Sequence, residues 1–141
     1  MERQDWLILV LARGGSLSPV QIQKALFLLG REAPEAVADS FYNFQPYDYG
    51  PFDASIYTDA FELQAQGLVA IENPASRGWR RYSLTGDGQE KAQGLEAGID
   101  EGTLVALSST LSWVKRQSFS DLVRTIYENY PEFKVNSVFR G

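Results

Sequence analysis

The sequence predicts a mainly α-helical fold with a small β-hairpin, arranged as a winged helix-turn-helix with a C-terminal helical extension. Apolar residues recur at helical spacing in several segments, and one central segment instead alternates as strands do. Three helices followed by a hairpin give the order of a winged helix, a relative of the helix-turn-helix. We expect a winged-helix domain over residues 1–98 and a helical extension over residues 99–141 that packs on it and offers a dimer interface.

Three helices are expected in the first half of the chain. Residues 3–13 place apolar side chains at helical spacing and stop at a glycine pair. A second helix, apolar on all sides and therefore central, begins with Ser18 as its N-cap and Pro19 in its first turn. The third helix is expected over residues 53–66, where Asp53 is suited to cap the first turn. In a winged helix this third helix occupies the recognition position.

The pattern changes after the third helix. Residues 68–72 are short and rich in β-branched side chains, and residues 79–84 alternate, with turn residues between the two segments. This pattern predicts a two-stranded hairpin whose connecting loop is the wing. Thr85 is expected to cap a further helix over residues 86–97, and helical spacing continues over about 103–130.

The composition limits the chemistry that the chain can perform. Its 141 residues carry a net charge of -5 and include neither cysteine nor histidine. Disulfides, thiolate zinc sites, cysteine nucleophiles and the usual general base of neutral pH are therefore excluded. The sequence also contains no phosphate loop and no nucleophile elbow. We expect no enzyme activity, no cofactor and no metal site, and the lack of cysteine fits a cytoplasmic location.

A short apolar run near the start of the sequence is expected to be a buried helix. Residues 6–12 read "WLILVLA", which is far shorter than the roughly 18 apolar residues that suggest a membrane span. Glu2 and Asp5 precede the run, where a signal peptide would carry positive charge. We therefore expect neither a targeting segment nor a membrane partner.

The stretch "GLVAIENPASRGWRRYSLTGDGQEKA" resembles the helix-to-wing segment of many bacterial winged-helix regulators. In those proteins the third helix runs into Gly-Leu-Val or Gly-Leu-Ile, and the second wing strand ends in Tyr-x-Leu-Thr before a glycine and a helix. The matching positions are Gly67, Leu68, Val69, Tyr82, Leu84, Thr85 and Gly88. The resemblance implies the winged-helix fold and says less about function.

Two further motifs, "IQKALFLLG" and "YGPFDASIYTDAFELQAQGLV", resemble the bacterial YwgA-like proteins and, more distantly, the Panacea domain of SocA-like antitoxins. The matching residues are Gln23, Lys24, Leu26, Phe27, Tyr49, Gly50, Pro51, Tyr57, Gly67 and Leu68. The ending "YENYPEFKVNS" is also similar to YwgA-like C-termini, whereas Ala25 stands where the antitoxin pattern has leucine. The resemblance implies an antitoxin that neutralises a toxin encoded beside it, largely through protein contacts.

The helix over residues 53–66 is expected to meet a protein partner. It contains no lysine or arginine, whereas a DNA reader places cations or amides on this helix and needs several of them to neutralise phosphates. We therefore predict a non-enzymatic regulatory module whose partner is a protein, such as the toxin encoded by a neighbouring gene. The predicted partner-binding residues are Asp53, Tyr57, Asp59, Glu62, Tyr47 and Tyr49.

The aromatic-rich connection over residues 40–52 allows three interpretations. Its six rings can form core, a partner surface or a pocket for a small ligand. We expect core first, because aromatic side chains anchor long connections. In that interpretation Tyr47 and Tyr49 fix the start of the third helix against the core and do not stack on a base.

The alternative function is a DNA-binding transcriptional regulator that uses the wing and a homodimer to widen its basic surface. Arg77, Arg80 and Arg81 surround Trp79, and such a group can clamp phosphate or enter a minor groove. It can equally meet an acidic protein. The simplest interpretation is an exposed hairpin that carries arginine, with Trp79 covering the core.

Overall fold

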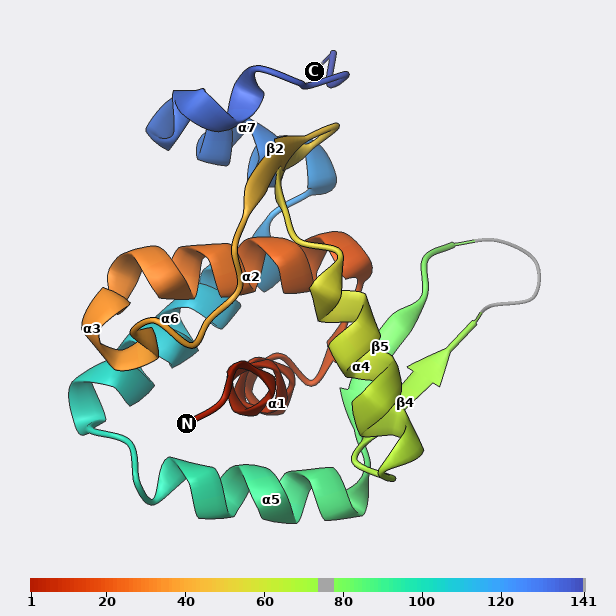
Figure 1. The fold of residues 1–141 in the computed structure, drawn as a ribbon. Coiled ribbons are helices and arrows are strands. Elements are labelled where there is room, and N and C mark those ends of the chain that lie inside the picture. The colour runs from red at the N-terminus through yellow and green to blue at the C-terminus, as the bar shows by residue number, and fades with distance from the viewer. Residues whose placement is uncertain (74–77, 141) are drawn as a thin grey trace.

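The computed structural model describes residues 1–73 and 78–140 and shows a mainly helical protein with a small antiparallel β component (Figure 1). The helices are α1 (Arg3–Gly14), α2 (Pro19–Glu32), α3 (Pro34–Val37), α4 (Ser55–Ala65), α5 (Gly86–Glu96), α6 (Glu101–Arg116), α7 (Phe119–Asn129) and the 3-10 helix η1 (Pro131–Lys134). The strands are β1 (Ser16–Leu17), β2 (Gln45–Tyr47), β3 (Gly50–Phe52), β4 (Val69–Glu72) and β5 (Arg81–Leu84). Residues 74–77 lie outside the described ranges.

Helix α1 forms the centre of the molecule. Figure 1 shows it end-on, with α2 and α6 on one side, α5 on another and α4 beside it. Six consecutive side chains of this helix are buried: Trp6, Leu7, Ile8, Leu9, Val10 and Leu11. The apolar side chains point to all sides of α1, and neighbouring elements cover each side. The predicted buried helix is therefore confirmed.

The predicted hairpin is present as β4 and β5. The two strands pair antiparallel, with Val69 opposite Leu84 and Glu72 opposite Arg81. A third strand, β1, pairs antiparallel with the other edge of β5, so the order across the sheet is β1-β5-β4. The sequence did not predict β1, because two residues are too few to show a strand period. The sheet therefore joins the chain segment after α1 to the β4–β5 hairpin.

A second hairpin lies within the aromatic-rich connection. Strands β2 and β3 pair antiparallel, with Tyr47 opposite Gly50, so only residues 48 and 49 form the turn. Gly50 has a φ of 108°, a backbone conformation that side chains with a Cβ rarely adopt. The sequence predicted an aromatic-rich connection over residues 40–52 but not the two strands within it. The hairpin extends from the helical body next to α7 and η1 (Figure 1).

The helix starts follow the predicted caps. Ser18 caps α2 and Thr85 caps α5, and each side-chain oxygen accepts a backbone N–H of the first turn. Helix α4 begins at Ser55, two residues later than expected, but Asp53 still holds its first turn. The carboxylate oxygen Oδ1 of Asp53 accepts hydrogen bonds from the backbone N–H of Ser55 at 2.9 Å and from its hydroxyl at 2.6 Å.

The C-terminal helices pack on the rest of the chain. Helix α6 lies against α1 and α2, and Leu107, Leu111 and Val114 join the same buried cluster as α1. Helix α7 contacts β3 and continues into η1. The boundary near residue 98 and the role of this segment in a dimer stay predictions. Within the described ranges, no helix combines the length and the apolar character that crossing a membrane requires.

Candidate functional site: an aromatic cleft with a buried lysine

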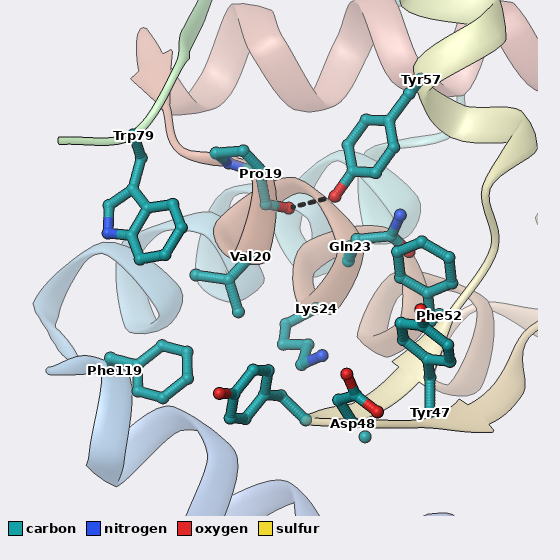
Figure 2. A pocket seen from close by; sticks show the side chains of 12 residues that line it. Pro19, Val20, Gln23, Lys24, Tyr47, Asp48, Phe52, Tyr57, Trp79 and Phe119 are labelled. Carbon is teal, nitrogen blue, oxygen red and sulfur yellow. Dashed lines mark hydrogen bonds between the residues drawn. The ribbon is translucent and has the colours of Figure 1, made fainter. Parts of the chain in front are cut away.

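A cavity of about 420 Å³ lies between the first turns of α2, the β2–β3 hairpin, α4, the start of β5 and the start of α7. Figure 2 shows the side chains around it. We call this cavity the aromatic cleft, because most of its large side chains are rings. Its lining residues are Pro19, Val20, Gln23, Lys24, Tyr47, Asp48, Tyr49, Gly50, Phe52, Tyr57, Trp79 and Phe119.

The rings of the cleft come from separate parts of the chain and leave part of their surface open. Tyr47 stacks on Phe52 with a centroid distance of 4.6 Å, and Tyr49 meets Phe119 edge-on at 5.1 Å. Tyr47 is 51% exposed and Trp79 is 70% exposed. The expectation that Tyr47 and Tyr49 anchor the third helix against the core is therefore wrong. Both residues flank or form the turn of a hairpin that projects from the body, so their rings reach the cleft.

The floor of the cleft carries a buried lysine. Lys24 is only 3% exposed, and its Nζ donates a hydrogen bond to the backbone oxygen of Pro51 at 3.2 Å. Burial disfavours the ammonium form and lowers the pKa of Lys24 to about 8. No ion pair in the described part of the chain includes Lys24. A charge that folds away from water without a counter-charge is unusual in a stable core.

Neighbouring contacts fix the lysine in place. The Gln23 side-chain amide donates to the backbone oxygen of Asp53 and accepts from its backbone N–H, both at 3.0 Å. A Cβ added to Gly50 would lie 3.3 Å from a ring carbon of Tyr127 and 3.7 Å from Nζ of Lys24. The turn must therefore carry glycine both for its φ and for space. These contacts join the two motifs that resemble YwgA-like proteins into one structural unit.

Tyr57 forms the wall of the cleft on the α4 side. Its hydroxyl donates to the backbone oxygen of Pro19 at 3.5 Å, a contact shown in Figure 2. Its ring lies 6.0 Å from that of Phe52 and 6.3 Å from that of Tyr82. Burial raises the pKa of Tyr57, so its hydroxyl stays protonated and acts as a donor. Tyr47, Tyr49 and Tyr57 are thus the three predicted partner-binding residues that the structure brings together.

The three acidic residues of the predicted partner site lie elsewhere. Asp59 is buried, where it accepts hydrogen bonds from Arg3 at 2.9 and 3.2 Å and from the hydroxyl of Tyr42 at 2.7 Å. Burial, and then the bond to Asp59, raise the pKa of Tyr42 above its ordinary value. The carboxylate of Asp53 binds Ser55 at the start of α4, whereas Glu62 is exposed outside the cleft. The carboxylate of Asp59 is thus buried and bonded to Arg3 and Tyr42, so Asp59 is not part of a contact surface.

The wing arginines do not converge on one point in the described structure. Arg77 lies outside the described residues. The Nε of Arg80 donates to the side chain of Asn73 at 2.8 Å, and its guanidinium lies 5.5 Å from the centre of the Phe61 ring. Arg80 therefore packs toward α4.

Arg81 is held by the edge strand of the sheet. Its Nε donates to the Ser16 hydroxyl at 3.0 Å and its Nη2 to the Ser16 backbone oxygen at 2.7 Å. These bonds tie β5 to β1 and give Arg81 a structural role. Trp79 turns the other way and lines the aromatic cleft, so the expectation that it covers the core is wrong.

The residue patterns gave no site role to Gln23, Lys24 or Phe119. The signal for Lys24 was a lysine directly before the apolar run Ala25 to Leu29, in a helix predicted to be central. Comparison with known proteins adds nothing to this assignment, because no family model and no curated protein matches the chain. In residues 1–73 and 78–140, no group of three acidic side chains is placed to hold a metal ion. The cleft offers flat rings, tyrosine hydroxyls, the Gln23 amide, the Lys24 ammonium and the Asp48 carboxylate, which are groups suited to binding.

Proposed function

We propose that this protein is a non-enzymatic winged-helix regulatory module that acts through protein contacts, as an antitoxin of the Panacea type does. The order of elements supports the winged helix: α1, α2 and α4 precede the β4–β5 hairpin, and β1 completes a small sheet. The resemblance of the motifs around Lys24 and Gly50 supports the antitoxin-like role, and their direct contact shows that they act as one structural unit.

One observation carries the proposal of a protein contact. Exposed rings from three segments that are distant in the sequence meet around a single cleft: Tyr47 and Tyr49, Trp79, and Phe119. A cluster of exposed rings contributes little to the stability of the fold and is typical of an interaction site. Tryptophan and tyrosine are also among the residues that contribute most to binding energy at protein interfaces. The rim of the aromatic cleft is therefore the contact surface that we assign to the partner.

The charges of the recognition-position helix favour a protein partner over DNA. No lysine or arginine occurs between Asp53 and Gly67, and Glu62 is exposed on this helix. A phosphate backbone would meet few cations here, because Arg81 is occupied by Ser16 and Arg80 packs on α4.

The test is co-purification with the product of the neighbouring gene. The tagged protein, the Trp79→Ala variant and the Phe61→Ala variant are each co-expressed with that product. Phe61 is the matched control, since its ring is also exposed, at 46%, but lies outside the cleft. We expect Trp79→Ala to lose the complex by about tenfold or more and Phe61→Ala to retain it. A neighbouring product that is not toxic and forms no complex contradicts the proposal.

The DNA-binding alternative rests on the exposure of Arg80 at the wing. It predicts binding to duplex DNA that weakens with salt and disappears when Arg77, Arg80 and Arg81 are all replaced by alanine. Fluorescence anisotropy with labelled duplexes measures this directly. Binding that the triple variant leaves unchanged excludes the wing as a DNA contact.

A further inference from the structure

The Lys24 ammonium keeps hydrogen-bonding capacity that the described protein does not use. An ammonium has three N–H donors, and the structure assigns one of them to the Pro51 backbone oxygen. None of the ion pairs within the described ranges involves Lys24, although its side chain is almost fully buried. A buried cation without a counter-charge is strongly unfavourable, so an anion placed beside Nζ would relieve that penalty.

The space next to this ammonium has the size of a small-molecule site. The cleft encloses about 420 Å³, within the range of roughly 300–1,000 Å³ that such sites occupy. Trp79 and Phe119 lie on the side of the cleft next to Val20 (Figure 2). Tyr49 also lines the cleft and meets the ring of Phe119 edge-on. Flat ring systems pack against such walls, since aromatic pairs prefer edge-on or offset contacts.

We propose that the aromatic cleft binds a small organic monoanion in which a carboxylate is attached to a flat apolar ring. The carboxylate pairs with Nζ of Lys24, and the ring lies against Trp79, Tyr49 and Phe119. This inference goes beyond the proposed protein contact and does not depend on it, because the cavity and its ammonium belong to the chain itself.

The charges around the cleft favour a carboxylate over a phosphate. Phosphate sites gather several donors, commonly the backbone N–H groups of a helix N-terminus. At the start of α2, Pro19 has no N–H, and the N–H of Gln21 already donates to Ser18. Asp48 also lines the cleft, and a dianion would be repelled by it. Lys24 supplies one positive charge to the cleft, which matches a ligand with a single negative charge.

Two neutral polar groups of the cleft, the Gln23 amide and the Tyr57 hydroxyl, are already bonded within the protein. The Gln23 amide is bonded to Asp53 in both directions, and the Tyr57 hydroxyl donates to Pro19. Lys24 is the one basic residue among the described residues that line the cleft, so we expect it to discriminate between an anionic and a neutral ligand. The ligand class can be tested with compounds that share one ring and differ only in the polar group.

Naphthoate, naphthamide and naphthyl phosphate are titrated separately into the ¹⁵N-labelled protein and followed by NMR. We expect naphthoate to bind at least about thirtyfold more tightly than naphthamide, because the amide leaves the buried ammonium unpaired. We also expect it to bind more tightly than naphthyl phosphate and to shift the indole N–H resonance of Trp79. Tighter binding of the phosphate, equal binding of the amide, or shifts that spare Trp79 overturn the proposal, as does the absence of saturable naphthoate binding.

Two variants then test whether Lys24 causes the preference for naphthoate. Lys24→Met is expected to reduce naphthoate affinity to the level of naphthamide, while Lys91→Met retains the wild-type preference. Lys91 is an exposed lysine on α5 and controls for a general change of charge. Unchanged naphthoate binding by Lys24→Met contradicts the assignment. The comparison of the three ligands on the wild-type protein decides the ligand class even if Lys24→Met does not fold.

Discussion

Replacement of Lys24 by methionine is expected to change how the stability of the protein depends on pH. In the folded protein, burial lowers the pKa of Lys24 to about 8 from its ordinary value of 10.5. The folded state therefore binds fewer protons than the unfolded state between these two values, and the free energy of unfolding rises with pH in this window. Below pH 8 the folded protein carries the full penalty of the buried ammonium, which is about 3 kcal/mol for a shift of this size.

The size of the effect follows from the two pKa values. Between pH 7 and pH 9.5, Lys24 is expected to add about 2 kcal/mol to the free energy of unfolding of the wild type. The Lys24→Met variant lacks this titration. At pH 7 we expect the variant to be more stable than the wild type by about 1–3 kcal/mol, because removal of the buried charge outweighs loss of the bond to Pro51.

Urea unfolding at pH 7 and pH 9.5, followed by circular dichroism, measures both quantities. The difference between the wild type and the variant is the useful value, since it removes titrations that the two proteins share. The groups near the ammonium, Asp48, Tyr49 and Tyr127, are present in both proteins. If the difference stays constant across this pH range, Lys24 does not titrate as the structure implies, and the reasoning from its burial is wrong.

Two further predictions concern stability, and both are measured by urea unfolding at pH 7. Arg3→Met should destabilise the fold by about 1–3 kcal/mol, because the buried carboxylate of Asp59 loses its cation and keeps only the bond from Tyr42, while the exposed side of Arg3 is screened by water. Adding Asp59→Asn should recover part of this loss, and strictly additive effects would contradict the pairing. Gly88→Ala should cost about 1–3 kcal/mol, since the new Cβ would clash with the backbone oxygen of Leu68. Gly94→Ala on the same helix meets no atom within 4 Å and should stabilise the fold by up to about 1 kcal/mol. Similar effects of both substitutions would refute the packing argument.

Elements with local signals were predictable from the sequence. The caps Ser18 and Thr85 act within their own first turns, and the β4–β5 hairpin has both an alternating pattern and turn residues. Strand β1 and the β2–β3 hairpin were missed, because two or three residues do not establish a strand period. Their pairing is decided by the elements that they meet in the fold, which no short window of sequence contains.

The candidate site was predictable only in part, since exposure depends on distant contacts. Tyr47 and Tyr49 were marked as aromatic residues of interest, but their residue type does not show whether a ring is buried or borders a cavity. Asp59 looked like a surface acid on a helix, yet Arg3, 56 residues away, binds it inside the fold. Lys24 was buried by a backbone segment 27 residues further on, so its environment was not visible in its own helix.

Two neighbouring residues of α2, Gln23 and Lys24, differ in whether the stability of the fold requires them. Gln23 holds the backbone of Asp53 through two hydrogen bonds with neutral groups, and this is sufficient to attach α2 to the segment before α4. A methionine or leucine at position 24 would fill the same space without the penalty of a buried charge. An ammonium at this position adds one hydrogen bond to the backbone oxygen of Pro51, but we expect the penalty of the buried charge to exceed the contribution of that bond. Residues that lower stability in this way are typical of functional sites. We therefore expect the stability and the ligand preference of Lys24→Met, measured together, to be the most informative result. A variant that is more stable than the wild type and no longer prefers a carboxylate would show that Lys24 is kept for ligand binding and not for folding.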